Sequence, residues 1–148
     1  MSETQTVETR SGGFEGWFIK FGSQKLPMKY LNKGGYSSTP NQRQEASAWQ
    51  DTGGHLHRDT ASHYRTKIEF KTVDGITLAE KQEIQSIMNS AITDKKERKG
   101  SITYWNEEEN AYKQATVYIP DITFEVDEVD EKRKTVYYNS IRIALIEY

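Results

Sequence analysis

Cysteine is missing from the sequence, and so are several features that identify common classes of protein. Without a thiol, the chain can form no disulfide, thiolate nucleophile or thiolate metal site, which fits a reducing compartment. No apolar run is as long as a membrane span, and residues 1–5 lack the basic and apolar regions of a secretory signal. We therefore expect a soluble protein, made without export by a signal peptide and without membrane insertion.

Charge is also nearly balanced, because 20 basic residues face 22 acidic ones. The resulting net charge of −2 gives no general attraction to nucleic acid, so no specific nucleic-acid partner is expected. The 148 residues are most simply one domain, with a polar, flexible N-terminal arm over residues 1–13 and a single β-rich domain over residues 14–148. An alternative for the arm is that it becomes ordered on a neighbouring subunit.

The most informative stretch is residues 64–92, which predicts a strand, a tight turn and a helix. Charged and uncharged side chains alternate over residues 64–71, as in a strand with one wet face and one packed face. Thr77 and Glu80 have the spacing of a capping box at a helix start. An apolar stripe with a helical period follows, so we predict a helix over residues 77–92. The stripe consists of Ile84, Ile87, Met88, Ala91 and Ile92.

The other regular segments read as strands, and they predict an α+β fold. This would be mainly an antiparallel β-sandwich or split barrel, with the single helix on its flank. The last strand is apolar on nearly both faces, so it should lie centrally in a sheet. The predicted strands are residues 17–21, 24–28, 101–105, 115–119, 122–126 and 141–146, with an acidic turn at 106–110 and a charged turn at 127–134.

Residues 30–57 show no period, and Gly, Ser, Asn, Gln and Pro dominate their first half. A structureless connection of this length is uncommon inside a domain unless it has a function. We predict a long loop that packs on another chain, with Trp49 as an anchor. The alternative is a surface loop with Trp49 tucked back onto its own core.

All three histidines lie close together, at His55, His57 and His63. His55 and His57, together with either Asp59 or His63, would give a three-ligand metal site with one open position, as in a metal-dependent hydrolase. The H-x-H-x-D-H motif of metallo-hydrolases is incomplete, however, because Thr60 stands where its last histidine belongs. A polar turn is the simpler interpretation, and we expect no metal, no cofactor and no enzymatic activity.

The turn and the strand after it resemble small structural proteins of tailed bacteriophages and prophages. The turn has the pattern D-x-x-G-x-x-x-R-D, with Asp51, Gly54, Arg58 and Asp59 at its fixed positions. A strand of the K-I-E-hydrophobic type, the T-x-x-E helix and a closing strand at residues 138–143 follow in the same order. The element order is also similar to the tail-tube fold of tube, distal-tail and baseplate ring proteins.

This resemblance implies a virion structural protein that forms rings, namely the hexamers of a tail tube, distal tail or baseplate. Its partners would be further copies of itself and neighbouring tail proteins, in a virion tail assembled in the host cytoplasm. Under this hypothesis we expect inter-subunit contacts at Tyr36, Trp49, Arg58 and Asp59. Two alternatives stay open: a host- or carbohydrate-binding β module using exposed tyrosines and Trp105, and the metal-dependent hydrolase.

Overall fold

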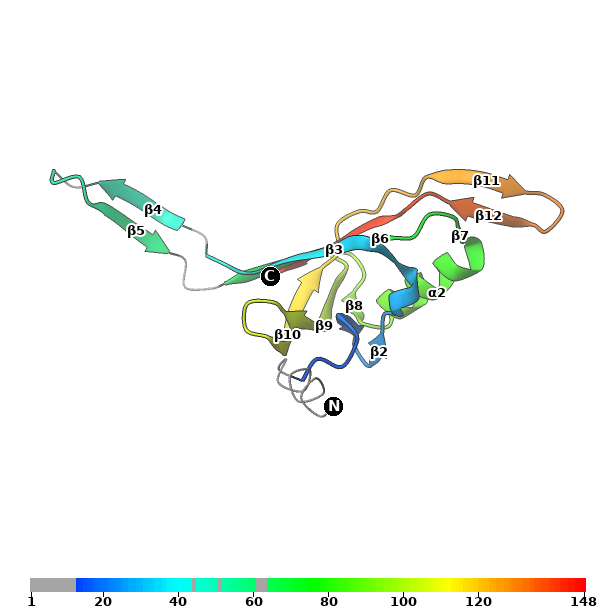
Figure 1. Cartoon of the computed structure of the whole chain (residues 1–148), viewed down its shortest axis with the longest axis horizontal. Helices are drawn as coiled ribbons and strands as arrows, with labels where there is room; N and C mark the ends of the chain where they lie inside the picture. The colour runs from blue at the N-terminus through cyan, green and yellow to red at the C-terminus, as the bar shows by residue number, and fades with distance from the viewer. Residues whose placement is uncertain (1–12, 44, 51, 61–63) are drawn as a thin grey trace, which may run out of the picture.

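The computed structural model describes residues 13–43, 45–50, 52–60 and 64–148, with the backbone alone at 45–49 and 57–60. Its strands form an eight-stranded sheet, a three-stranded sheet and a separate two-stranded hairpin, as Figure 1 shows. The elements are β1 (Ile19–Phe21), β2 (Gln24–Lys25), the 3-10 turn η1 (Met28–Tyr30), β3 (Leu31–Gln42), β4 (Glu45–Gln50), β5 (Leu56–Thr60), β6 (Arg65–Thr72), β7 (Ile76–Thr77), α2 (Leu78–Asn89), β8 (Ile92–Asp94), β9 (Lys99–Asn106), β10 (Ala111–Tyr118), β11 (Val126–Asp130), β12 (Thr135–Tyr138) and β13 (Arg142–Glu147).

The large sheet runs in the order β2-β1-β9-β10-β13-β6-β3, with β8 also paired to β9, and every pairing in it is antiparallel. β13 lies between β10 and β6 and buries three consecutive residues, Ile143 to Leu145. The prediction of a central last strand is therefore confirmed. The predicted alternation along β6 is also confirmed, because Thr66, Ile68, Phe70 and Thr72 face the core.

The large sheet curls until its two margins approach one another. Phe18, which precedes β1, stacks on Tyr36 of β3 with ring centroids 4.5 Å apart. At the other end of β3, the Asn106 side chain at the end of β9 donates a hydrogen bond to Asn41 at 3.2 Å. The mainly antiparallel α+β fold predicted from the sequence is confirmed, and the curl gives it the form of a split barrel.

Helix α2 packs on the core with Ile84, Ile87 and Met88. Its start is the predicted capping box, since Thr77 accepts a hydrogen bond from the Glu80 amide and Glu80 accepts one from the Thr77 amide. The helix ends at Asn89, three residues earlier than predicted, because Ile92 already belongs to β8. No helix in the described ranges is long and apolar enough to cross a membrane.

The predicted long loop over residues 30–57 is wrong, because this region contains β3, β4 and β5. β3 is an edge strand, and its pairing with β6 shifts register between Leu31 and Tyr36 and again between Thr39 and Gln42. Such bulges interrupt the alternation of side chains on which a strand prediction depends. Gly34 supplies the positive φ of 74° inside the first irregularity.

The segment after Pro120 also differs from the prediction. Residues 121–125 form no strand, and the stretch 127–134, expected as a charged turn, contains most of β11 and the turn that connects it to β12. β11 is exposed over four of its five residues. A charged segment can be a strand when it forms an outer edge that buries little, and its composition then resembles that of a turn.

Candidate functional site: a projecting hairpin and its base

The hairpin β4–β5 extends away from the rest of the molecule at one end of its longest axis (Figure 1). Among the residues that the structure describes, β4 and β5 pair with each other and with no strand of the two larger sheets. Its tip is exposed from Thr52 to Leu56, and the Leu56 side chain keeps 59% of its surface accessible. We call this hairpin, residues 45–60, the β4–β5 arm. A two-stranded hairpin alone is at best marginally stable in water, so contact with another surface would stabilise the arm.

Arg43 fixes the base of the arm. Its guanidinium donates two hydrogen bonds to the Glu108 carboxylate, at 2.7 and 3.0 Å, from opposite prongs of the fork. The same group lies 5.1 Å from the ring centroid of Tyr64, the residue immediately before β6. These bonds hold the pKa of Glu108 down, to about 2, with help from Asn41, and they raise the pKa of Arg43.

A buried polar network continues inward from this clamp. Asn41 has a positive φ of 51°, and its side chain donates to both Glu108 and Glu109. The Asn106 amide group donates to Asn41 and to the Tyr104 hydroxyl, which lies 3.0 Å from the Thr66 hydroxyl. Asn106 is fully buried, so these bonds tie the end of β3 to the turn between β9 and β10. The arm therefore leaves the body from a fixed base.

Three of the residues predicted as inter-subunit contacts lie on this arm. Trp49 of β4 is opposite His57 of β5, Arg58 is opposite Ala48, and Asp59 is opposite Ser47. The side chains of these three residues lie outside the described part of the structure, so the contacts stay predictions. The backbone register does bring the three residues onto the one element that projects.

Tyr36, the fourth predicted contact, lies on the body in β3. Its ring stacks on Phe18, and its hydroxyl group is buried without a hydrogen-bond partner among the described residues, as is that of Ser38. Burial raises the pKa of Tyr36. Its contact with another subunit stays a prediction, and its ring contributes to closing the split barrel.

The histidines are distributed over the arm and the segment after it. His55 is exposed at the tip, His57 lies in β5 with its side chain undescribed, and His63 is outside the described residues. Over the ranges that the structure describes, no group of three or more candidate ligands could hold a metal ion. The three-histidine site therefore stays an untested alternative.

The alternative of a binding module that uses Trp105 as an exposed platform is wrong in this detail. Trp105 is only 6% exposed, because Phe14 and Tyr112 pack edge-on against its ring at 5.2 and 5.0 Å. The sequence places Trp105 next to an acidic turn, which gives no sign that the N-terminal segment covers it.

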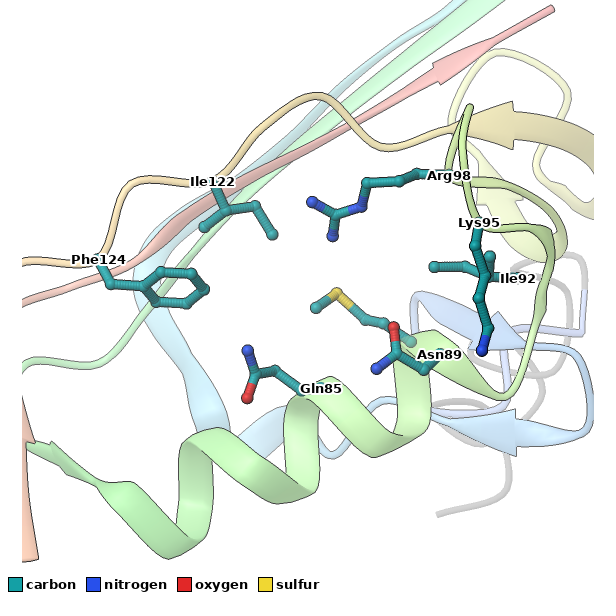
Figure 2. A pocket seen from close by; sticks show the side chains of 8 residues that line it. Gln85, Asn89, Ile92, Lys95, Arg98, Ile122 and Phe124 are labelled. Carbon is teal, nitrogen blue, oxygen red and sulfur yellow. The ribbon is translucent and has the colours of Figure 1, made fainter.

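A second hairpin, β11–β12, extends at the other end of the longest axis (Figure 1). It joins β7 in the three-stranded sheet, and its outer strand exposes Val126 and Val129 by 56% and 60%. Where β11 begins, a pocket of about 620 Å³ opens between α2 and residues 122–124. Figure 2 shows Gln85 and Asn89 of α2 below this space, with Ile122, Phe124 and Arg98 pointing into it.

Sequence reasoning missed the clamp at the base of the arm. The acidic turn at Glu107 to Glu109 looks like a solubility element in the sequence, and Asn41 and Arg43 lie in what reads as a loop. Arg43 and Glu108 are 65 positions apart, so no local pattern connects them. Only the asparagines that flank the acidic turn, Asn106 and Asn110, hint at a specific backbone shape there.

Comparisons with known proteins give one family and one solved structure. The model of a family of unknown function (DUF6711) matches residues 11–148. No curated protein matches the chain. A chain described as the tail of an empty GTA particle, with helical refinement and C6 symmetry, aligns over 92% of this chain and 98% of its own. The two are 10% identical with a TM-score of 0.45.

Proposed function

The chain belongs to DUF6711, a family of unknown function, and we propose that it is a structural protein of a phage-like tail that assembles with its own copies into a ring. The virion tail would be its location, after assembly in the host cytoplasm. A ring of six copies in the tube, distal tail or baseplate is the form that we propose. In this proposal the protein works through contacts between surfaces, and we assign no catalytic group.

The observation that carries this proposal is the β4–β5 arm on its fixed base. The arm exposes Leu56 at its tip and leaves one backbone edge of each strand unpaired with the sheets of the body. Such edges are ready to pair with another chain, and proteins normally shorten, charge or cover them. A rigid base with an exposed two-stranded arm therefore favours a contact made in an assembly.

The positions of the two hairpins support a ring in particular. They lie at opposite ends of the long axis (Figure 1), so each copy has two unlike ends, and in the proposed ring the arm of one copy contacts a different part of its neighbour. Contacts between unlike surfaces are heterologous, and they close into a ring when the rotation between copies permits it. This is the symmetry on which the proposed function depends.

The test is assembly with and without the arm. We expect the purified full chain, alone or with its neighbouring tail proteins, to form rings or tubes visible by negative-stain electron microscopy. Replacing residues 45–60 by a short Gly-Ser turn should leave a folded monomer, with cooperative unfolding unchanged because Arg43 and Tyr64 are retained. A full chain that stays monomeric at high concentration and never enters particles would refute the proposal.

A further inference from the structure

We propose that the free edge of β3 on one copy pairs, as strand to strand, with the free edge of β4 on the arm of a second copy. This inference rests on the proposed function, and it names the place where a neighbour receives the arm. We call residues 34–42 of β3 the receiving edge.

The first step concerns which strands have an unpaired edge. Among the described residues, the strands with such an edge are β2, β3, β4, β5, β7, β8 and β11. Proteins normally protect an unpaired edge by keeping it short or by placing charge on it. β2, β7 and β8 are two or three residues long, β5 carries Arg58 and Asp59, and β11 carries carboxylates at Asp127, Glu128 and Asp130. These edges are protected, which leaves β3 and β4.

The second step is that β3 and β4 lack charge over most of their length. The receiving edge contains no charged residue, and β4 is uncharged from Ala46 to Gln50. The register irregularities of β3 lie on either side of Tyr36 to Thr39, and these four residues pair with β6 without interruption. A regular, uncharged edge can accept an added strand through backbone hydrogen bonds, and a second uncharged edge brings no like charge to oppose the pairing.

The third step is the surface beside β3. A groove of about 500 Å³ lies along β3 from Leu31 to Ser38, with Phe18 and Met28 among its apolar lining. Met28 is exposed by 38%. Lys33 and Glu107 are the charged residues of this lining, and their signs cancel. Such a groove suits an uncharged strand with a large aromatic residue, and β4 contains Trp49.

The fourth step decides which edges meet. β3 belongs to the large sheet of the body, whereas β4 lies on the arm that projects from it (Figure 1). A contact of β3 with β3 would leave both arms uncovered. A contact of β4 with β3 covers the arm of one copy and the receiving edge of the next, and it can repeat around a ring.

Cross-linking tests the contact, because the chain contains no cysteine and single cysteines can be introduced. We expect a Ser37→Cys copy, mixed with an Ala48→Cys copy of different mass, to be joined efficiently by a short bifunctional thiol reagent. The matched control replaces Ser37→Cys by Thr116→Cys, since Thr116 is also exposed but lies on β10, which is paired on both sides. Ser37→Cys copies that link mainly to one another would indicate a symmetric β3 contact and overturn the inference.

Added charge tests the same edge, because it supplies the protection that β3 lacks. Ser37→Lys combined with Thr39→Lys should weaken assembly by about tenfold or more. Gln114→Lys combined with Thr116→Lys, at exposed positions on β10, should leave it nearly unchanged. Thermal unfolding of both variants checks that each still folds.

The outcomes separate this inference from the proposed function. If the chain assembles, but neither the cross-links nor the lysine variants distinguish β3 from β10, the receiving edge is refuted while the proposed function stands. If no assembly forms under any condition, the proposed function fails and the inference fails with it.

Discussion

At the scale of single residues, Arg43 joins three parts of the chain that the sequence separates widely. It follows β3, its guanidinium binds Glu108 beyond β9, and it lies over the ring of Tyr64 before β6. The planar guanidinium suits both tasks, since its fork matches a carboxylate and its face stacks on an aromatic ring. A lysine at this position would retain the positive charge, but it could neither bind the carboxylate with two parallel hydrogen bonds nor stack a flat face on the ring.

The clamp predicts a pH dependence at the base of the arm. The pKa of Glu108 is depressed in the folded state to about 2, chiefly by its hydrogen bonds from Arg43. A depressed pKa means that the contribution of Glu108 is complete above its ordinary pKa of 4.5 and is lost as the pH falls from there toward 2. We expect amide hydrogen exchange at residues 41–43 to accelerate over this window. NMR titration should show Glu108 returning toward its ordinary pKa in Arg43→Gln, and an unchanged value there would contradict the clamp.

At the scale of elements, local chemistry decided what the sequence could predict. The capping box at Thr77 and the apolar stripe of α2 lie within one helix, so their spacing identifies the helix and its start. β6 and β13 are predicted correctly because the order of polar and apolar side chains within each strand indicates which of its residues are buried. β3 is missed because its bulges and its polar edge position come from its pairing with β6, whose paired residues lie 23 or more positions away.

The same limit applies to the candidate site. The sequence identified Trp49, Arg58 and Asp59 as contact residues, and all three lie on the element that projects. It could not show that the element is a hairpin, or that Asn41 and Asn106 hold its base, since those bonds connect residues 65 positions apart.

Gly100 gives a prediction about how α2 and β8 are held against β9. A Cβ atom at this position would lie 2.3 Å from the carbonyl oxygen of Ala91 and 2.8 Å from its carbonyl carbon, and backbone atoms cannot yield cheaply. Gly100→Ala should therefore lower the free energy of unfolding by about 1–3 kcal/mol. Urea denaturation measures this, with Ser101→Ala as the control, because Ser101 is exposed on the same strand. Equal stability of the two variants would show that the helix exit moves freely.

At the scale of the whole molecule, the two projecting hairpins give each copy two unlike ends. In the proposed ring, each copy gives its arm to one neighbour and receives the arm of the other. Two copies that exchanged arms with each other would instead close a two-fold dimer, so the number of copies in the assembly distinguishes the two arrangements.

In such a ring, a copy without its arm should block assembly. A chain with residues 45–60 replaced by a Gly-Ser turn keeps the rest of its surface, so it can receive an arm and join a growing ring, but it cannot bind the next copy. If rings have six copies, mixing equal amounts of this variant with the full chain should leave only about one ring in sixty free of it. Mass photometry and negative-stain microscopy would then show closed rings falling far more steeply than the fraction of full-length chain. A loss in simple proportion to the variant added would indicate that each contact is symmetric, with both arms meeting at one place.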